Sequence, residues 1–233
     1  MSLYVIGDLH LSETTHKEMD IFGGKWVGYR EKISDSLAVL NDEDTLIIAG
    51  DLSWGIDLNE ALADFKFLNR FKGQKILLKG NHDLWWSTVS KMEAFFAENA
   101  IQNINFLQNN SYMYNNVALC GTRGWMFENE KITEHDKKVL KREVMRLELS
   151  LSDAQKNGAD KIYCFMHYPP VYGNRKCDEI MELLQKYKVE KCFYGHLHGS
   201  AHALARQGVI DGIDFRLISA DFIGFKPFEI KFD

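Results

Sequence analysis

Proline and cysteine are scarce in this chain. Its 233 residues contain 3 prolines and 4 cysteines, and there is no proline- or serine-rich linker, internal repeat or low-complexity tract. The cysteines, at positions 120, 164, 177 and 192, lack the CxxC spacing of many metal and redox sites. Three of them lie in apolar, strand-like runs, where a thiol behaves as a small hydrophobic side chain. We therefore expect four reduced core thiols and a single domain over residues 1–233.

Long hydrophobic runs and an excess of basic charge are also missing. No apolar stretch approaches the roughly 18 to 20 residues that span a bilayer, and no basic region precedes the apolar start that leads to Asp8. The formal net charge of −5 argues against broad binding of DNA or RNA phosphates. These absences predict a soluble, cytoplasmic protein that is not secreted and does not bind membranes, and they disfavour nucleic acid as a partner.

Short β-rich runs alternate with amphipathic stretches along the chain, and 45% of its residues are hydrophobic. The β-rich runs span residues 3–6, 45–49, 75–78, 117–120, 161–166 and 191–194. Helical patterns span residues 30–40, 58–71, 88–99, 133–156 and 177–187, and Thr133 with Asp136 approximates a capping box at the start of the fourth. This alternation is typical of an α/β domain. Segments 104–120 and 213–232 hold successive strands without helices between them, so the sheets should be mixed.

Polar side chains follow five of these strands, at the point where each strand ends. They are Asp8 and His10, Asp51, Asn81 and His82, His167, and finally His196 and His198. Open α/β sheets place ligands and chemistry at the carboxyl ends of their strands. Each residue alone has a structural explanation, such as a turn aspartate or a helix cap. Their joint occurrence favours a site, and the remaining histidines, His16, His135 and His202, are assigned no role.

The mixture of imidazole, carboxylate and amide groups is suited to transition metals. Nitrogen and oxygen ligands together favour Mn, Fe, Zn or Co, whereas Mg or Ca would prefer oxygen alone. In Asp-x-His and His-x-His the alternate side chains point the same way in an extended turn, so each pair can supply two ligands. There are enough ligands for two divalent ions, which a carboxylate could bridge. Which metals bind is left open by the sequence, as is the oligomeric state.

The motifs GDLH, GD, GNHD, MH and GHLH occur in this order between residues 7 and 198. In this set and order the sequence resembles the calcineurin-like metallophosphoesterase superfamily. The resemblance implies an α/β fold with α+β mixed sheets, a four-layer α/β/β/α sandwich of two mixed β-sheets flanked by helices. It also implies a dinuclear-metal-dependent phosphoesterase that hydrolyses phosphomonoesters or phosphodiesters of small molecules by attack of a metal-bridging hydroxide, with nucleotides among the candidates.

The resemblance further implies a role for each matching residue. One metal would be held by Asp8, His10 and His198, the other by Asn81, His167 and His196, with Asp51 bridging them. His82 would face the leaving group and protonate it or stabilise its charge. Many members of the family carry an acidic residue three positions after the bridging aspartate, to orient the catalytic histidine. Trp54 occupies that position here, which leaves open what orients His82; Asp83 and Asp57 are candidates for this role.

Two arginines and several aromatic residues are candidates for substrate binding. Arg123 follows a predicted strand and Arg175 lies on the loop after His167, and a surface or structural role is the alternative for both. Aromatic side chains near the expected ligands could stack a nucleobase or pack in the core: Trp54, Trp85, Trp86, Tyr168 and Tyr172. We expect at least one of the adjacent tryptophans to be core.

Two other functions compete with the hydrolysis of small phosphate esters. A nuclease of the same superfamily is disfavoured by the acidic net charge. A non-catalytic, metal-binding scaffold for protein interaction is the alternative from a different class, because some relatives of this fold have lost ligands. In this sequence all seven ligand positions and His82 hold the expected residue types, which favours the enzyme.

Overall fold

One mixed sheet is built mainly from the N-terminal half of the chain. The computed structural model describes residues 1–15, 17, 19–127 and 132–232. The strands of this first sheet are β1 (Leu3–Ile6), β2 (Thr45–Ala49), β3 (Gln74–Leu78), β4 (Ile104–Phe106) and β13 (Phe228–Ile230). Their order is β13-β1-β2-β3-β4, in which β1 to β4 run parallel and β13 pairs antiparallel with β1.

A second mixed sheet follows in the chain. Its strands are β5 (Tyr112–Tyr114), β6 (Val117–Thr122), β7 (Lys161–Met166), β10 (Lys191–Tyr194), β11 (Gly208–Ile210) and β12 (Ile213–Leu217). In the order β11-β12-β10-β7-β6-β5 the four central strands are parallel and the two edge strands antiparallel. A separate two-stranded ribbon joins β8 (Val171–Tyr172) to β9 (Arg175–Lys176).

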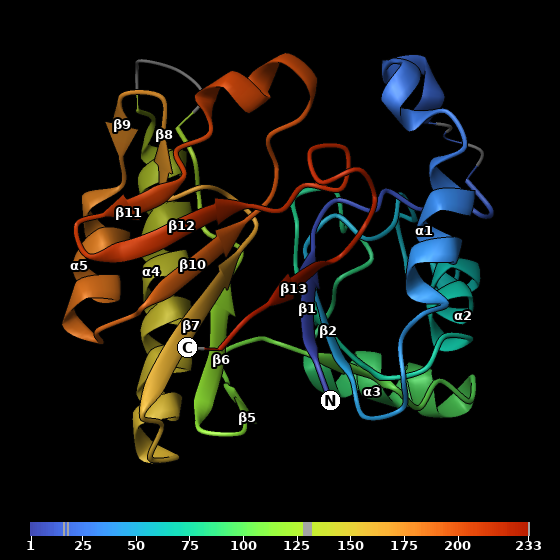
Figure 1. The fold of residues 1–233 in the computed structure, drawn as a ribbon, viewed down its shortest axis with the longest axis horizontal. Coiled ribbons are helices and arrows are strands. Elements are labelled where there is room, and N and C mark those ends of the chain that lie inside the picture. Colours follow the sequence, from blue (N-terminus) through green and yellow to red (C-terminus); the bar gives the residue numbers. More distant parts are fainter. Residues whose placement is uncertain (16, 18, 128–131, 233) are drawn as a thin grey trace.

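Helices cover the outer face of each sheet (Figure 1). On the first sheet lie α1 (Tyr29–Leu37), α2 (Leu62–Asn69) and α3 (Val89–Glu98), and on the second lie α4 (Glu134–Lys156) and α5 (Asp178–Lys186). Short 3₁₀ helices span Met19–Phe22, Gly24–Trp26 and Gly199–Leu204. The result is the four-layer α/β/β/α sandwich that the family resemblance implies.

The alternation of side chains in β2 shows how the layers are held together. Ile47 points to the core between the two sheets, whereas Leu46 and Ile48 pack against the helices outside. From the opposite sheet Phe165 and Phe193 fill the same central core, with stacked rings whose centroids are 5.3 Å apart. Because both faces of each sheet are buried, their central strands read as continuous apolar runs.

The structure confirms the capping box and the buried thiols. The backbone N–H of Asp136 donates to Thr133 Oγ1 at 3.1 Å, and the Asp136 carboxylate accepts from the Thr133 N–H at 2.8 Å. All four cysteines are free and buried. None of the helices in the described ranges has the length and apolar character needed to cross a membrane.

Candidate metal centre

Two parts of the predicted site face each other from the two sheets. β1, β2 and β3 of the first sheet and β7 and β10 of the second all end at one edge of the sandwich, directly before the predicted ligands. Isolated pairing between Gly7 and Ser219, together with a hydrogen bond from Gly195 N to His167 O at 3.1 Å, joins the loops at this edge. Ligands as far apart in the chain as residues 8 and 198 therefore meet.

The first group of polar atoms contains Asp8, His10 and His198. His198 Nε2 lies 3.5 Å from Asp8 Oδ1 and 3.3 Å from His10 Nε2. One nitrogen or oxygen of each residue lies within 4.8 Å of the others. Asp8 and His10 are buried and His198 is partly exposed, so the group is open on the His198 side.

The second group contains Asp51, Asn81, His167 and His196. Asn81 Oδ1 lies 2.6 Å from His167 Nε2 and 3.0 Å from His196 Nδ1. Asp51 Oδ2 lies 3.5 Å from His167 Nε2 and 3.7 Å from His10 Nε2. Asp51 thus lies between the two groups, which is the place a bridging carboxylate must take.

The hydrogen bonds around His167 allow a test of whether a cation fits. His167 Nδ1 lies 3.2 Å from the carbonyl oxygen of Ala49, an acceptor, so this nitrogen carries the proton. Nε2 then presents a lone pair toward Asn81 Oδ1 and Asp51 Oδ2, which are acceptors as well. Acceptors that converge without a donor are what a metal site requires, and the nitrogen and oxygen donor set fits a divalent transition metal.

The backbone is strained at four of the predicted ligands. Asp8, His10, Asp51 and His196 have φ angles of 62°, 47°, 52° and 71°, in the left-handed region that residues with a Cβ rarely adopt. Such conformations cost on the order of 1–3 kcal/mol each and gather at functional sites. The surrounding fold imposes these angles, which turn the side chains from the strand ends into the site.

Gly80 of the GNHD motif permits a close approach between two ligand loops. A Cβ at this position would lie 2.0 Å from Asp51 Oδ1 and 2.2 Å from Asp51 N. The same side chain of Asp51 accepts a hydrogen bond from the backbone N–H of His82 at 2.8 Å. Only a glycine lets the loop after β3 lie this close to the loop after β2.

Charge is distributed unevenly within the site. Burial would raise the pKa of Asp8, but His198, His167 and His10 together outweigh it and hold the pKa below its ordinary value. Burial and the neighbouring charge of Asp8 raise the pKa of Asp51 to about 8. His198 loses solvation through burial, yet Asp8 and Asp221 raise its pKa to about 10. Asp8 and Asp221 therefore stabilise a positive charge at His198, here the proton on its imidazole ring, where a metal cation would bind.

Asp221 is a functional candidate that the sequence reasoning missed. Its carboxylate lies 2.9 Å from His198 Nδ1, accepts from Gly199 N at 3.1 Å and lies 3.2 Å from His202 Nε2. A carboxylate on the far nitrogen of a ligand histidine fixes the ring and its tautomer. Asp221 follows β12, which is parallel to β10, so its position after a strand was the available signal.

Trp54 packs where the family pattern would place an acidic residue. Its ring centroid is 4.4 Å from that of His82 and 4.9 Å from that of His10. Lys17 Nζ lies 3.4 Å from the centroid of the indole ring, while the buried Nε1 has no hydrogen-bond partner in the described ranges. Burial, and the nearby His167, lower the pKa of His82 to about 4. His82 is therefore held by ring packing in a neutral form.

Neither carboxylate that was expected to stand in for the missing acid contacts the His82 ring. Asp83 is buried and accepts backbone N–H bonds from Gly80, Asp51 and Leu52 at 2.7 to 2.9 Å, and the Trp85 indole N–H at 3.0 Å. Asp57 accepts from Asn59 N and Glu60 N. Asp83 therefore fastens the loops that carry Asp51 and Asn81, and Asp57 closes a local turn.

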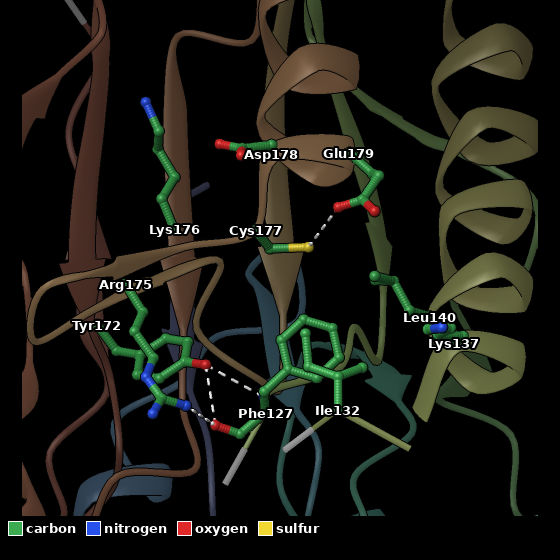
Figure 2. Close-up of a pocket in the computed structure, with 10 residues that line it drawn as sticks. All are labelled: Phe127, Ile132, Lys137, Leu140, Tyr172, Arg175, Lys176, Cys177, Asp178 and Glu179. Atoms are coloured by element: carbon green, nitrogen blue, oxygen red, sulfur yellow. Dashed lines mark hydrogen bonds between the residues drawn. The ribbon is translucent and has the colours of Figure 1, made fainter. Parts of the chain in front are cut away.

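The two arginines lie in different pockets. Arg123 lines a cavity with Lys79, near the predicted ligands. Arg175 lines a larger cavity of about 790 Å³, none of whose ten described lining residues is a predicted ligand (Figure 2). There its Nη1 donates to the Phe127 carbonyl at 2.9 Å. A substrate-binding role for Arg175 stays a prediction.

The aromatic residues divide between core and site. Trp85 is buried in the core under the first sheet, as expected for one of the two adjacent tryptophans, and Tyr172 is buried with its hydroxyl bonded to Phe127. Tyr168 is also buried and packs on His196, with ring centroids 4.3 Å apart. Trp54 and Trp86 are only partly buried and remain available to a ligand.

The family to which the chain belongs is one of metal-dependent phosphoester hydrolases. The family model of calcineurin-like phosphoesterases matches residues 1–200, and the chain belongs to that family. No curated protein matches the chain significantly by sequence.

Several solved structures share the fold. The phosphopantetheinyl hydrolase PptH from Mycobacterium tuberculosis is 14% identical and has a TM-score of 0.57, over 100% of this chain and 96% of that one. A protein of unknown function from Aquifex aeolicus, AQ665, is 17% identical with a TM-score of 0.51, over 98% and 95%. TT1561 of Thermus thermophilus is 12% identical with a TM-score of 0.52, over 87% and 85%.

Proposed function

We propose that this protein hydrolyses phosphomonoesters or phosphodiesters of small molecules with the help of two divalent transition-metal ions. The observation that carries the proposal is the position of Asp51, whose Oδ2 lies 3.5 Å from His167 Nε2 and 3.7 Å from His10 Nε2. One carboxylate oxygen thus borders two groups of ligand atoms, as a dinuclear centre requires. Asp8, His10 and His198 would hold one ion, and Asn81, His167 and His196 the other.

The residues of the site would have separate roles in the proposed hydrolysis. Bound at these ligands, two divalent ions would activate water for attack on phosphorus and offset charge on the phosphoryl oxygens. The carboxylates of Asp8 and Asp51 would offset only part of the charge of two divalent ions. The site would therefore remain positive and attract the dianion of a phosphate ester. Asp221 and the Ala49 carbonyl fix the rings of His198 and His167, which keeps their other nitrogens turned inward.

His82 would act on the leaving group. It lies on the loop after β3, beside Asn81, and its ring contacts only partly cover it. The pKa of about 4 makes the imidazole neutral at pH 7, and a neutral imidazole still carries one N–H that can donate to a departing oxygen. His82 would therefore stabilise the leaving alkoxide by hydrogen bonding and proton donation.

Small-molecule substrates, nucleotides among them, are favoured over macromolecules by charge and by the aromatic surface. Trp54 and Trp86 are partly exposed next to the site and could stack a base or another flat group. A fold neighbour bears the name phosphopantetheinyl hydrolase, which is a precedent for small phosphate esters on this architecture. Manganese, iron, zinc and cobalt are the candidate metals for this nitrogen and oxygen ligand set.

The test begins with metal content. Protein purified without chelator should hold close to two transition-metal equivalents, and Asp51→Asn should lower the occupancy of both sites. A panel of nucleotides, cyclic nucleotides, sugar phosphates and phosphopeptides then defines the substrate. Hydrolysis of DNA or RNA alone would favour the nuclease, and two bound metals without any turnover would favour the non-catalytic scaffold.

A further inference from the structure

A second cavity lies at the same edge of the sandwich as the metal ligands. It encloses about 250 Å³ between the end of β3, the end of β6, the start of α3 and the middle of α4. Lys79, Thr88, Arg123 and Arg146 are among the residues that line it.

The cavity lies beside the proposed catalytic residues in the chain and in space. Lys79 precedes Asn81 by two residues, and the cavity residue Trp86 follows His82 by four. The carbonyl of Arg123 accepts from the backbone N–H of Tyr168 at 2.9 Å. Tyr168 follows His167 and packs against the ring of His196 at 4.3 Å. A molecule bound at the metal ligands would therefore have this cavity as its neighbour.

The lining of the cavity is positively charged, although the whole chain is acidic. Among the described residues that line it, Lys79, Arg123 and Arg146 face one carboxylate, that of Glu143, so their formal charges sum to +2. The chain as a whole carries −5. A local excess of this sign in a partly enclosed space attracts anions.

Glu143 does not neutralise all three cations. Its buried carboxylate accepts from Thr122 Oγ1 at 2.6 Å and from Arg146 Nη1 at 2.7 Å, and lies 3.5 Å from Arg123 Nη2. Arg123 Nε is buried without a hydrogen-bond partner in the described ranges. Lys79 Nζ likewise has neither a hydrogen bond nor an ion pair with any described residue. The Nε–H group of Arg123 and the ammonium group of Lys79 thus remain able to donate hydrogen bonds to a ligand.

The start of α3 adds backbone donors to the same cavity. Thr88 is the N-cap of this ten-residue helix, and its side chain makes no capping hydrogen bond. The first N–H groups of a helix have no partner within the helix and carry a partial positive charge, so they bind phosphate and other anions. Ser87 and Thr88 bring their hydroxyl groups to the lining as well.

We propose that this cavity is a second anion subsite, which binds a phosphoryl group of the substrate other than the one that is hydrolysed. The inference rests on the proposed function and narrows it to phosphate esters that carry a second phosphate. Lys79 and Arg123 bind that group directly. The carboxylate of Glu143, which Arg146 holds in place, orients the guanidinium group of Arg123.

Direct binding tests the subsite without any turnover. The full chain, depleted of metal by chelation and checked for folding by circular dichroism, is titrated with inorganic phosphate and pyrophosphate in a calorimeter. The wild type should bind pyrophosphate, and Lys79→Gln and Arg123→Gln should each weaken the binding about tenfold or more. Lys138→Gln, which removes an exposed charge from α4, is the matched control and should change nothing. Equal binding by wild type and Lys79→Gln would overturn the proposal.

Kinetics of the metal-loaded enzyme tests the substrate class. p-Nitrophenyl phosphate represents esters with one phosphate, and ADP, adenosine 3′,5′-bisphosphate and fructose 1,6-bisphosphate represent those with two. Lys79→Gln should lower kcat/KM about tenfold for at least one compound of the second set, mainly through KM, and less than twofold for p-nitrophenyl phosphate. An equal loss on every compound, or no loss on any, would overturn the assignment to substrate.

The two tests keep the failures apart. If the metal-loaded wild type hydrolyses none of these esters, the proposed function fails and the pyrophosphate titration alone decides whether the anion subsite exists. If the metal-loaded wild type hydrolyses p-nitrophenyl phosphate but the calorimeter detects no binding of pyrophosphate, the proposal of an anion subsite is wrong and the proposed phosphoesterase activity is retained.

Discussion

The indole ring of Trp54 lies against the imidazole of His82, with ring centroids 4.4 Å apart, and also stacks on His10 at 4.9 Å. In many calcineurin-like enzymes this position is acidic and orients the histidine by a hydrogen bond. Here packing restricts the ring instead, and Lys17 above the indole face adds a cation–π contact. Among the described residues, no carboxylate forms a hydrogen bond with a ring nitrogen of His82.

Removal of this packing should disturb catalysis more than binding. We expect Trp54→Ala to lower kcat about tenfold or more while KM changes little, because a mobile His82 donates less effectively to the leaving group. Trp54→Phe, which keeps an aromatic ring, should recover most of the rate. Metal content is measured in parallel because Trp54 also touches His10. Unchanged kcat in Trp54→Ala with both metals bound would contradict the orienting role.

The role of His82 can be separated from metal binding by the choice of leaving group. His82→Ala should retain both metals and lose about 10²- to 10⁴-fold in kcat on alkyl phosphates, whose alkoxide needs a proton. The loss should be much smaller on p-nitrophenyl phosphate, since nitrophenolate leaves without one. Equal losses on both substrates would remove His82 from leaving-group catalysis.

Asp221 should matter through His198. Its carboxylate lies 2.9 Å from His198 Nδ1, so Asp221→Asn replaces a charged acceptor by a neutral amide. We expect metal affinity to fall about 10- to 100-fold, the effect typical of such supporting carboxylates. Competition with a calibrated chelator measures the change. Asp160→Asn, at an exposed position, serves as the control and should bind metal normally.

Gly80→Ala should damage the site through a steric clash. The added Cβ would lie 2.0 Å from Asp51 Oδ1, and relief would require the loops after β2 and β3 to separate. We expect a loss of about 1–3 kcal/mol in the free energy of unfolding together with loss of metal. Gly24→Ala is a matched control, because its Cβ would meet nothing within 4 Å. Denaturant titration and metal analysis of both variants provide the comparison.

Asp64 should make the stability of the protein depend on pH. It is buried, accepts from Ser53 Oγ and from Glu13 N, and burial raises its pKa to about 6. A raised pKa means that the folded state holds the proton more tightly than the unfolded state. This contribution therefore favours folding near pH 4 and is lost as pH rises toward 6.

The comparison with Asp64→Asn isolates that contribution. The fall in the free energy of unfolding between pH 4 and pH 6.5 should be smaller in the variant, by about 2–3 kcal/mol at most. Urea titrations across this range, in chelator so that metal occupancy is constant, measure the difference. The exposed Asp35→Asn should follow the wild type. Parallel curves for Asp64→Asn and wild type would show that the proton is bound elsewhere.

The strand ends were readable from the sequence because local chemistry determines them. β1, β2, β7 and β10 have the predicted bounds, since each apolar run stops at a glycine or a polar residue that turns the chain into the site. The helix at 58–71 was predicted too long: α2 spans Leu62–Asn69, because Asp57 accepts backbone N–H bonds from Asn59 and Glu60 in a turn before it. Local turn chemistry overrode the apolar pattern there.

The supporting residues could not be read in the same way. Asp221 is distant in sequence from His198, and Glu143 is distant from Thr122 and Arg123; neither belongs to a short motif. The ring packing of Trp54 depends on tertiary neighbours, so a missing acidic residue suggested other carboxylates in its place. Arg123 was singled out for its position after a strand, whereas the cation cluster around it follows only from the meeting of β3, β6, α3 and α4.

The predicted ligands come from both halves of the sandwich. Asp8, His10, Asp51 and Asn81 follow strands of the first sheet, and His167, His196 and His198 follow strands of the second. Ions shared between them would cross-link the halves and close a loop of the chain from residue 8 to residue 198. The four thiols of the protein are all buried and free, so the bound ions would provide the kind of cross-link that a disulfide provides in other proteins. Removal of the ions should therefore lower the force that is needed to separate the two sheets.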